Sequence, residues 1–304
     1  MESNFRKTLL LRAKIYERIR GFFADLEVLE VETPLLLAGA NPSPWLENFQ
    51  IDGLYLQTSP ELAMKRLLAM GSGDIYQLCK AFRKNELGRL HNPEFTILEW
   101  YRLGIDHHQL MDEVEKLIIT VFATSKFKRF TYQEIYESVT GVNPHDTTLK
   151  ELQQLTKRNG IEVEGIGNDQ DTWVQLIFTH LIEPKLDENV PIFIYDFPKS
   201  QAMLARIRDG KYQLASRFEL YYQGIELANG FHELNDFEEQ QRRFNADLAR
   251  RRDLGLVPMS MDDQFINSVR MLPDCSGVAL GIDRLTLIAV GGKSLDEVMP
   301  LRRN

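Results

Sequence analysis

Residues 81–100 read AFRKNELGRLHNPEFTILEW, and the fold of the chain is organised around this stretch. Residues 75–82 (IYQLCKAF) are apolar and rich in β-branched and aromatic side chains, which predicts a buried strand that ends at Arg83. A polar connection that contains a glycine covers residues 84–92. After it, residues 94–101 alternate in polarity and predict a second strand. The stretch therefore predicts two strands joined by a polar loop.

Glu99 lies in the middle of the second predicted strand. The two-residue period of a strand puts Phe95, Ile97, Glu99 and Tyr101 on one face. A carboxylate among apolar side chains is costly unless a partner pairs with it. One interpretation is a structural ion pair with an arginine such as Arg83. The other is a binding surface, with Arg83 on a phosphate or carboxylate and Glu99 on an amine of a ligand.

Composition limits the class of protein. A chain of 304 residues with 43% hydrophobic and 10% aromatic residues is typical of a globular protein with one large domain or two small ones. Its net charge of −8 gives no sign of a nucleic-acid surface. Cys79 and Cys275 are too few for a four-cysteine zinc site and predict reduced thiols of a cytoplasmic protein. The apolar run at residues 9–11 is too short for a signal peptide or a membrane span.

The N-terminal region predicts a helix, then a strand. Residues 4–25 have an amphipathic pattern, and residues 26–33 (LEVLEVET) predict a strand that ends at Pro34. The apolar residues near helical spacing are Leu9, Ala13, Tyr16, Ile19 and Phe23.

A second helix start lies at residues 58–61 (TSPE), between a predicted strand at 54–57 and a predicted helix at 62–70. Ser59 suits the helix cap, Pro60 the first helical position, and Glu61 the positive end of the helix dipole. Capping alone would explain these three residues.

The central part of the chain is predicted to be mostly helical. A helix is expected at residues 107–125, and capping boxes begin at Thr131 and Thr148. We interpret about residues 126–190 as a helical insertion without a chemical site. A buried strand is expected at residues 192–197.

Gln223-Gly224 predicts the two-residue turn of a second hairpin. In that register Tyr221 faces Glu226, so Glu219 and Glu226 are diagonal neighbours on one face. A divalent cation would relieve their repulsion, since Mg²⁺ prefers oxygen ligands. Alternatively, the two acids face solvent and bind nothing.

Asn229, Phe231 and Glu233 share strand parity and predict the wall of a pocket. Their face is opposite to that of Glu226 unless a bulge at Gly230 resets the phase. Further on, residues 277–284 (GVALGIDR) let the backbone approach a ligand and place Arg284 in the first turn of a helix, where anions are favoured.

Several segments together resemble the class II aminoacyl-tRNA synthetases, most closely the lysyl enzymes. Residues 21–34 (GFFADLEVLEVETP) resemble motif 1, residues 83–101 resemble motif 2, and residues 277–284 resemble motif 3. TSPE and residues 226–236 (ELANGFHELND) are also similar to lysyl-enzyme segments. The resemblance implies an α+β fold, in which an antiparallel sheet of six to seven strands is flanked by helices. It also implies a single catalytic domain over residues 1–304 and a homodimer.

The resemblance implies an ATP site that includes Mg²⁺. Arg83 and Arg284 would be the catalytic residues, with Arg83 on the α-phosphate and the substrate carboxylate. Phe95 would stack on adenine, and Glu219 with Glu226 would bind the metal. The implied ATP-binding residues are Arg83, Glu86, His91, Asn92, Phe95, Glu219 and Arg284, of which His91 and Arg284 would hold the distal phosphates.

The resemblance also implies an amino-acid pocket. Glu61 would accept the amino group near the substrate carboxylate, and Tyr101 and Glu233 would contact a distal ammonium group. The implied substrate-binding residues are Ser59, Glu61, Glu99, Tyr101, Asn229, Phe231, Glu233 and Ala279.

The chain departs from the lysyl pattern in three ways. Motif 1 begins near residue 15, so no anticodon-binding domain is expected. Ala279 replaces the middle glycine of motif 3, and its methyl group should disfavour α-lysine. Asn85 stands where motif 2 usually has a glutamate, so Glu86 is the candidate for the adenine contact.

With these departures, the chain is similar to the ligases that attach (R)-β-lysine to a lysine of elongation factor P. This resemblance implies an AMP-forming, ATP-dependent ligase with an aminoacyl-adenylate intermediate and elongation factor P as acceptor. Binding of tRNA is not expected, because the acidic chain shows no clear basic patch. The alternative is a truncated lysyl-tRNA synthetase-like enzyme that activates α-lysine for tRNA or another acceptor.

Overall fold

The computed structural model describes residues 4–122, 124, 126–163, 165, 167–186, 189–299 and 301. The chain divides into two compact units. Unit 1 consists of residues 1–124 and 233–304, and unit 2 of residues 125–232. The predicted insertion at about residues 126–190 falls within the range of unit 2, and its residues 164, 166, 187 and 188 lie outside the described part. A single catalytic domain stays a prediction.

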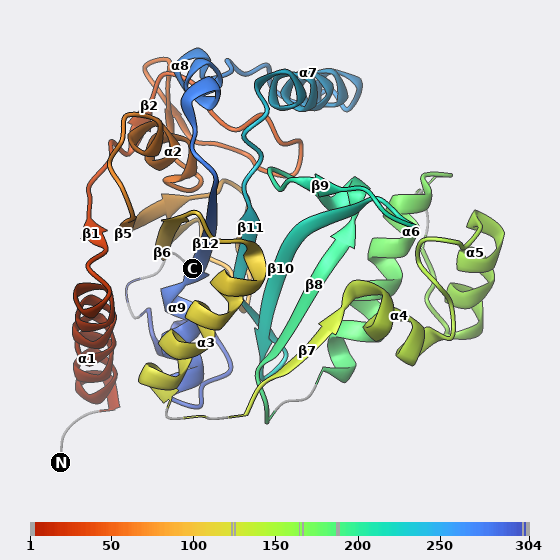
Figure 1. Ribbon diagram of the computed structural model, residues 1–304. Helices are drawn as coiled ribbons and strands as arrows, with labels where there is room; N and C mark the ends of the chain where they lie inside the picture. Colours follow the sequence, from red (N-terminus) through yellow and green to blue (C-terminus); the bar gives the residue numbers. More distant parts are fainter. Residues whose placement is uncertain are drawn as a thin grey trace. The chain divides into compact units, whose positions relative to one another are not determined.

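The hairpin at residues 75–103 is the centre of the larger sheet in unit 1 (Figure 1). Strand β5 (Ile75–Phe82) pairs in antiparallel fashion with β6 (Glu94–Leu103), which pairs in the same way with β12 (Cys275–Gly281). Strand β1 (Leu29–Glu30) adds a short parallel edge to β5. The predicted strand at residues 26–33 is therefore mostly wrong, because only Leu29 and Glu30 pair with β5.

The small sheet of unit 1 and its helices complete the unit. Strands β2 (Leu36–Leu37), β4 (Leu54–Leu56) and β3 (Gln50–Ile51) form the small sheet in that order. The helices are α1 (Asn4–Asp25), α2 (Glu61–Ala69), α3 (His107–Phe122), α7 (Phe237–Asp253), α8 (Asp263–Ser268) and α9 (Ile282–Ala289), with 3₁₀ turns at Val269–Met271 and Leu295–Glu297.

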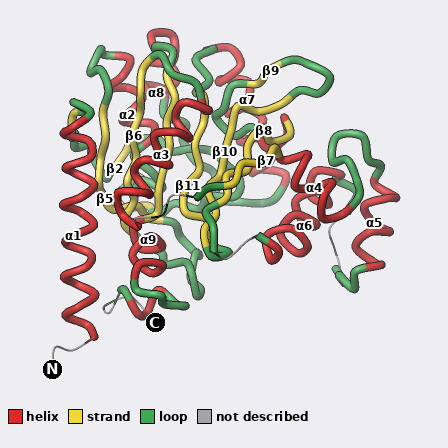
Figure 2. Tube along the Cα trace, turned by 60° about the horizontal axis from the view of Figure 1, so that its bottom comes forward, coloured by secondary structure: helices red, strands yellow, loops and turns green. Residues whose placement is uncertain are grey.

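The two faces of β6 have different neighbours (Figures 1 and 2). On one face, the indole Nε1–H of Trp100 donates to Glu113 of α3 at 2.9 Å, and Phe23 of α1 lies edge-on to the indole. On the opposite face, Tyr101 packs with Met64 of α2 in a buried apolar cluster. Helices α1 and α3 therefore cover the Trp100 face, and the Glu99 face looks toward α2.

The predicted bounds of helix α1 are confirmed, but its apolar face is only partly as predicted. Ile15, Ile19 and Phe23 are buried, whereas Leu9 is 46% exposed and Ala13 is exposed. Only the second half of the helix reaches the core, so the apolar residues of the first half remain at the surface.

Unit 2 contains its own strands and helices. Strands β11 (Ile225–His232), β10 (Leu214–Tyr222), β8 (Ile192–Pro198) and β7 (Lys128–Thr131) are neighbours in this order, and β9 (Ile207–Arg208) pairs with β10. The helices are α4 (Tyr132–Thr140), α5 (Leu149–Arg158) and α6 (Gln170–Ile177), with a π-helical turn at Phe178–Ile182 and 3₁₀ turns at Glu183–Lys185 and Lys199–Gln201. Both predicted capping boxes are present, at Thr131 and Thr148.

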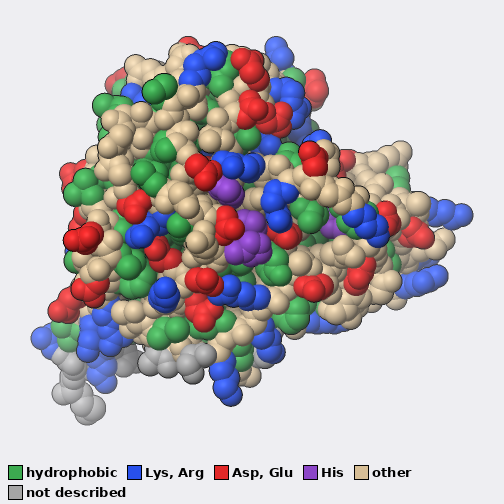
Figure 3. Space-filling model, in the orientation of Figure 1, with side chains coloured by type: hydrophobic (Ala, Val, Ile, Leu, Met, Phe, Trp, Pro, Cys, Tyr) green, Lys and Arg blue, Asp and Glu red, His purple; other side chains and the backbone are tan. Residues whose placement is uncertain are grey.

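The α+β prediction is confirmed, since mostly antiparallel strands occur with helices in both units. The described residues contain more strands than the six or seven expected, because short strands such as β1, β7 and β9 add to the long ones. Within the described residues, no helix combines the length and apolar character needed to span a bilayer. Basic and acidic side chains are interspersed over the face shown in Figure 3.

Candidate active site

The carboxylate of Glu99 lies in a buried polar cluster of unit 1, at the place of the predicted substrate pocket. Its side chain is 2% exposed, and its two oxygens accept hydrogen bonds from the hydroxyls of Ser59 and Tyr101, both at 2.6 Å. The predicted structural pair between Arg83 and Glu99 is wrong. Glu99 is opposite Gln77 in the β5–β6 register, and Arg83 follows the far end of β5. These two hydroxyl groups therefore stabilise Glu99 without neutralising its charge, so a cationic group of a ligand could still pair with it.

Lys65 of α2 brings two further carboxylates together. Its Nζ lies 2.7 Å from Oε1 of Glu61 and 2.6 Å from Oε2 of Glu233. Lys65 and Glu233 are each 1% exposed. The two acids predicted to contact substrate amino groups, Glu61 and Glu233, therefore share an ammonium group that belongs to the protein itself.

Burial sets the ionisation of these acids. It raises the pKa of Glu99 to about 7, with repulsion from Glu61 as a further cause. Burial also raises the pKa of Glu233 to about 8, although the positive charge of Lys65 opposes the shift. The pKa of Lys65 is raised because attraction from Glu233 and Glu61 exceeds the desolvation of its ammonium group. Lys65 therefore stays charged, and Glu99 and Glu233 titrate near neutral pH.

Strand β12 forms part of the pocket beside β6. Gly277 is opposite Tyr101 and Ala279 is opposite Glu99 in the register, so the four residues share one face. A Cβ atom at Gly277 would lie 2.2 Å from Cε1 of Tyr101 and 2.6 Å from Oε1 of Glu233. The glycine is required there because no side chain fits between the two groups.

Sequence reasoning assigned no role to Lys65 or Gly277. The spacing of Glu61 and Lys65, four residues apart on a helix, was the available signal for their contact. The role of Gly277 depends on the register of β6 and β12, which the sequence alone does not reveal.

The predicted ATP-binding residues of unit 1 lie around the loop between β5 and β6. The guanidinium of Arg83 donates to the carbonyl of Thr58 at 3.3 Å, lies 3.8 Å from Glu86, and stacks over the ring of Phe95 at 5.1 Å. Glu86 is thus the acidic neighbour of Arg83, and its contact with adenine stays a prediction.

A second cationic group lies at the start of α9. The guanidinium of Arg284 donates to Nε2 of His91 at 2.8 Å and to the carbonyl of Leu90 at 3.3 Å. Asn92 donates its amide to the carbonyl of Glu94 at 2.6 Å, and its buried Oδ1 accepts no hydrogen bond from the described residues. Arg284 can thus donate to a phosphate beside His91, whereas the Oδ1 of Asn92 is an acceptor and calls for a donor. The phosphate roles of His91 and Asn92 stay predictions.

The remaining predicted site residues belong to unit 2, where a β-bulge places them on one face of the β10–β11 hairpin. They are Glu219, Glu226, Asn229 and Phe231. The register pairs Leu220 with Ala228 and Tyr221 with Glu226, so Leu227 is the extra residue. The bulge lies at Leu227, whereas the sequence suggested Gly230. The predicted pairing of Tyr221 with Glu226 is confirmed, and both turn residues have positive φ, as a two-residue hairpin turn requires.

The bulge places Asn229 opposite Glu219 and Phe231 opposite Arg217. These residues therefore share the face that carries Tyr221 and Glu226. The buried carboxylate of Glu219 accepts hydrogen bonds from the guanidinium of Arg217 and, at 2.6 Å, from the hydroxyl of Tyr221.

Glu219 has acidic neighbours in unit 2. Burial raises its pKa, and so does the charge of Glu226. Glu183, whose pKa is raised to about 7 by burial and by the charges of Glu219 and Glu226, lies 3.4 Å from the hydroxyl of Tyr221. Carboxylate oxygens that repel one another are a donor set that fits Mg²⁺. The roles of Glu219, Glu226, Asn229 and Phe231 stay predictions.

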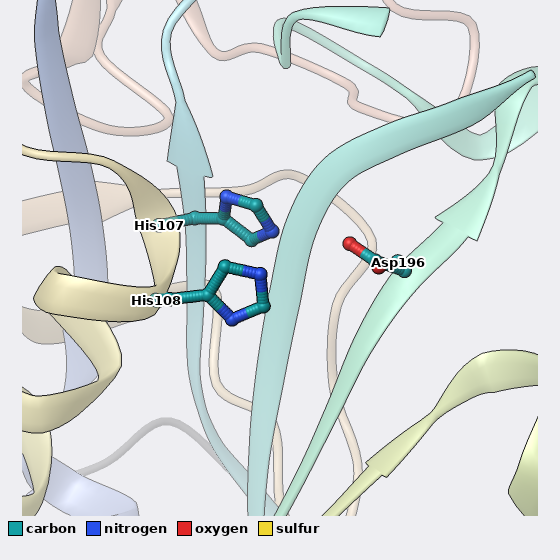
Figure 4. A group of neighbouring side chains, drawn as sticks. All are labelled: His107, His108 and Asp196. Carbon is teal, nitrogen blue, oxygen red and sulfur yellow. The ribbon is translucent and has the colours of Figure 1, made fainter. Parts of the chain in front are cut away.

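Two neighbouring histidines begin helix α3 (Figure 4). The rings of His107 and His108 lie 4.1 Å apart, and His107 is buried. Asp196, also drawn in Figure 4, belongs to β8 of unit 2 and pairs with Arg208. Sequence reasoning did not single out any of these three residues.

Comparison with known proteins agrees with the fold. A family model described as "tRNA synthetases class II (D, K and N)" matches residues 1–304. A protein of Vibrio cholerae is 48% identical over 94% of this chain and 92% of its own length. Proteins of Vibrio parahaemolyticus and Histophilus somni are 45% and 43% identical, over 98% and 96% of this chain and 98% and 94% of their own. All three are named elongation factor P–(R)-β-lysine ligase. The chain therefore belongs to the class II tRNA synthetase family and, within it, to these ATP-dependent ligases.

Proposed function

We propose that the protein activates (R)-β-lysine with ATP to form an aminoacyl-adenylate and transfers it to a lysine side chain of elongation factor P. The observation that carries the proposal is the buried acidic cluster of unit 1, where Glu61 and Glu233 contact the ammonium group of Lys65 and Glu99 is buried within range of its charge. Such an acidic pocket suits an amino acid with a second amino group. The names of the relatives supply the acceptor and the stereochemistry.

In the proposed complex, Glu61 accepts the amino group near the substrate carboxylate. Tyr101 and Glu233 contact the distal ammonium group, and Ser59 and Glu99 complete the polar wall. Ala279, opposite Glu99, limits the space between these ends of the pocket. The shifted amino group of a β-amino acid would suit this pocket, which is narrower than one with a glycine at position 279.

The first chemical step needs position and positive charge rather than a protein nucleophile. The substrate carboxylate attacks the α-phosphorus of ATP in line, the new C–O–P bond forms, and pyrophosphate leaves. Arg83 holds the carboxylate and the α-phosphate, while His91 and Arg284 hold the distal phosphates. The positive charges of Arg83 and Arg284 stabilise the negative charge that spreads over the phosphate oxygens in the transition state.

In the second step, the neutral amine of an acceptor lysine attacks the carbonyl carbon of the mixed anhydride. An amide forms, AMP leaves, and the amine loses a proton. A lysine amine has an ordinary pKa of about 10.4, so a buried docking environment that lowers this pKa would favour the reaction.

Mg²⁺ would be held by Glu219 and Glu226 and would neutralise phosphate charge when bound. We further propose a homodimer. The first half of α1 supports it, because the apolar side chains of Phe5, Leu9 and Leu10 are exposed there. Loss of the dimer on replacing Leu9 and Leu10 by glutamate, measured by sedimentation, would support this interface.

The deciding experiment is amino-acid-dependent ATP–pyrophosphate exchange. The proposal expects faster exchange with (R)-β-lysine than with α-lysine, and formation of an amide on purified elongation factor P. Arg83→Ala should abolish exchange, and Lys84→Ala, at an exposed neighbouring position to which no role is assigned, should retain it. Preference for α-lysine together with tRNA charging would support the truncated synthetase instead.

A further inference from the structure

The pocket of unit 1 contains a charged residue to which the proposed reaction gives no role. Lys65 is 1% exposed, and its ammonium group contacts Glu61 and Glu233, the acids that the proposed function assigns to the two substrate amino groups. A buried lysine is costly unless its charge is compensated. Two carboxylates are more than one ammonium group needs.

We propose that Lys65 is a positioning residue that holds Glu61 and Glu233 side by side and leaves the pocket two negative charges for a substrate with two ammonium groups. This inference rests on the proposed function and names the substrate class of the same pocket. The charge balance follows from the contacts. Glu61, Glu99 and Glu233 carry three negative charges when ionised, and Lys65 compensates one of them.

The contacts of Lys65 let it fix the positions of the carboxylates of Glu61 and Glu233. Glu61 and Lys65 are one turn apart on α2, so the helix fixes this contact. Glu233 follows β11, and its backbone N–H donates to the carbonyl of Cys275 on β12. Its carboxylate reaches Lys65 on one side and borders Gly277 on the other. Lys65 thus ties helix α2 to the segment that carries Glu233.

Two acids of the pocket, Glu233 and Glu99, respond to the charge of Lys65. Its positive charge lowers the pKa of Glu233 and of Glu99, against the effect of burial. Ser59 and Tyr101 hydrogen-bond to Glu99. Without Lys65, both acids would bind protons more tightly, and a substrate ammonium group would have to displace those protons.

The test is the pH dependence of the KM for (R)-β-lysine in the exchange assay. In the wild-type protein, KM should fall as pH rises through the pKa values of about 7 and 8 of Glu99 and Glu233. Lys65→Met should move this fall to higher pH and raise KM at neutral pH by about tenfold for each pH unit of the shift. The kcat should change much less, because the phosphate-binding residues are untouched.

Arg66→Met is the matched control. It removes one positive charge from the same helix, but Arg66 contacts Gln264 and Asp262 instead of the pocket. Its KM–pH profile should coincide with that of the wild type. If Lys65→Met also coincides with the wild type, the inference is wrong, whereas an inactive wild type overturns the proposed function itself.

Lys65→Arg keeps the test decisive if Lys65→Met does not fold. The guanidinium retains the charge but is larger and planar, so it should displace the two carboxylates without neutralising them. The inference expects a raised KM with an unshifted pH midpoint. An unchanged KM would show that the position of the carboxylates does not depend on Lys65.

Discussion

At the scale of single residues, the side-chain volumes at positions 277 and 279 of β12 are expected to set the size of the pocket. Gly277 leaves room for Tyr101 and Glu233, and Ala279 adds a methyl group opposite Glu99. The two positions lie two residues apart on one face of the strand, and we expect both to limit the space of the pocket. Small differences in volume there are expected to select between lysine isomers, since one methylene group changes binding by about 1–3 kcal/mol.

Ala279→Gly should raise the activation of α-lysine relative to (R)-β-lysine. The change removes the methyl group opposite Glu99 and enlarges the pocket by that volume. The measurement is the ratio of kcat/KM for the two substrates in the exchange assay, with an expected change of about tenfold or more.

Gly277→Ala tests the same prediction with the opposite change, because it adds a methyl group to the pocket instead of removing one. It adds a methyl group where a Cβ atom would overlap Tyr101, so it should reduce activity on both substrates. An unchanged ratio in Ala279→Gly would show that position 279 does not determine selectivity.

At the scale of elements, local sequence signals place the helices and turns that support the site. The carboxylates of Glu134 and Glu151 accept hydrogen bonds from the backbone N–H groups of the caps of α4 and α5, as the capping-box pattern predicts. The Gln223-Gly224 turn sets the register of β10 and β11. The bulge at Leu227 then places Glu219, Glu226 and Asn229 on one face.

Thr131→Ala should lower the free energy of unfolding by about 1 kcal/mol. The Thr131 hydroxyl accepts the backbone N–H of Glu134 at 3.1 Å, and this bond would be lost. Urea unfolding followed by circular dichroism measures the difference. Thr120→Ala is the control, since the exposed Thr120 hydroxyl donates to the carbonyl of Lys116 one turn earlier within α3, and it should have a smaller effect.

At the scale of the whole molecule, the acidic pocket couples folding to pH. Burial raises the pKa of Glu99 from its ordinary 4.5 to about 7, so between these values the folded protein holds a proton that the unfolded chain has lost. Stability therefore falls as pH rises through this range. A diammonium substrate that binds the ionised acids should offset this loss.

Glu99→Gln should flatten the pH dependence of the melting temperature between about pH 5 and 7. The difference in unfolding free energy across this range should shrink by about 1–3 kcal/mol, because the variant has no acid to titrate at this position. Glu94→Gln, at an exposed position of the same strand, should leave the slope unchanged. A steep slope in Glu99→Gln would assign the effect to other acids.

The sequence by itself determined the long elements and the family, and the roles of the site residues stay predictions. The bounds of α1 and β5 follow from strong periodicity, and the turn at Gln223-Gly224 follows from local backbone preference. These features depend on interactions between residues that are close in sequence, so the pattern along the chain is enough to predict them. The motifs around Arg83 and Arg284 likewise identified the family before any contact was known.

Only the tertiary structure decided which partners the site residues have. Glu99 pairs with two hydroxyls instead of Arg83, Glu61 and Glu233 share Lys65, and the bulge lies at Leu227. The physical reason is that a buried charge takes the partners that strand register and helix packing bring within reach. Register and packing depend on residues far apart in the chain, so no local pattern specifies them.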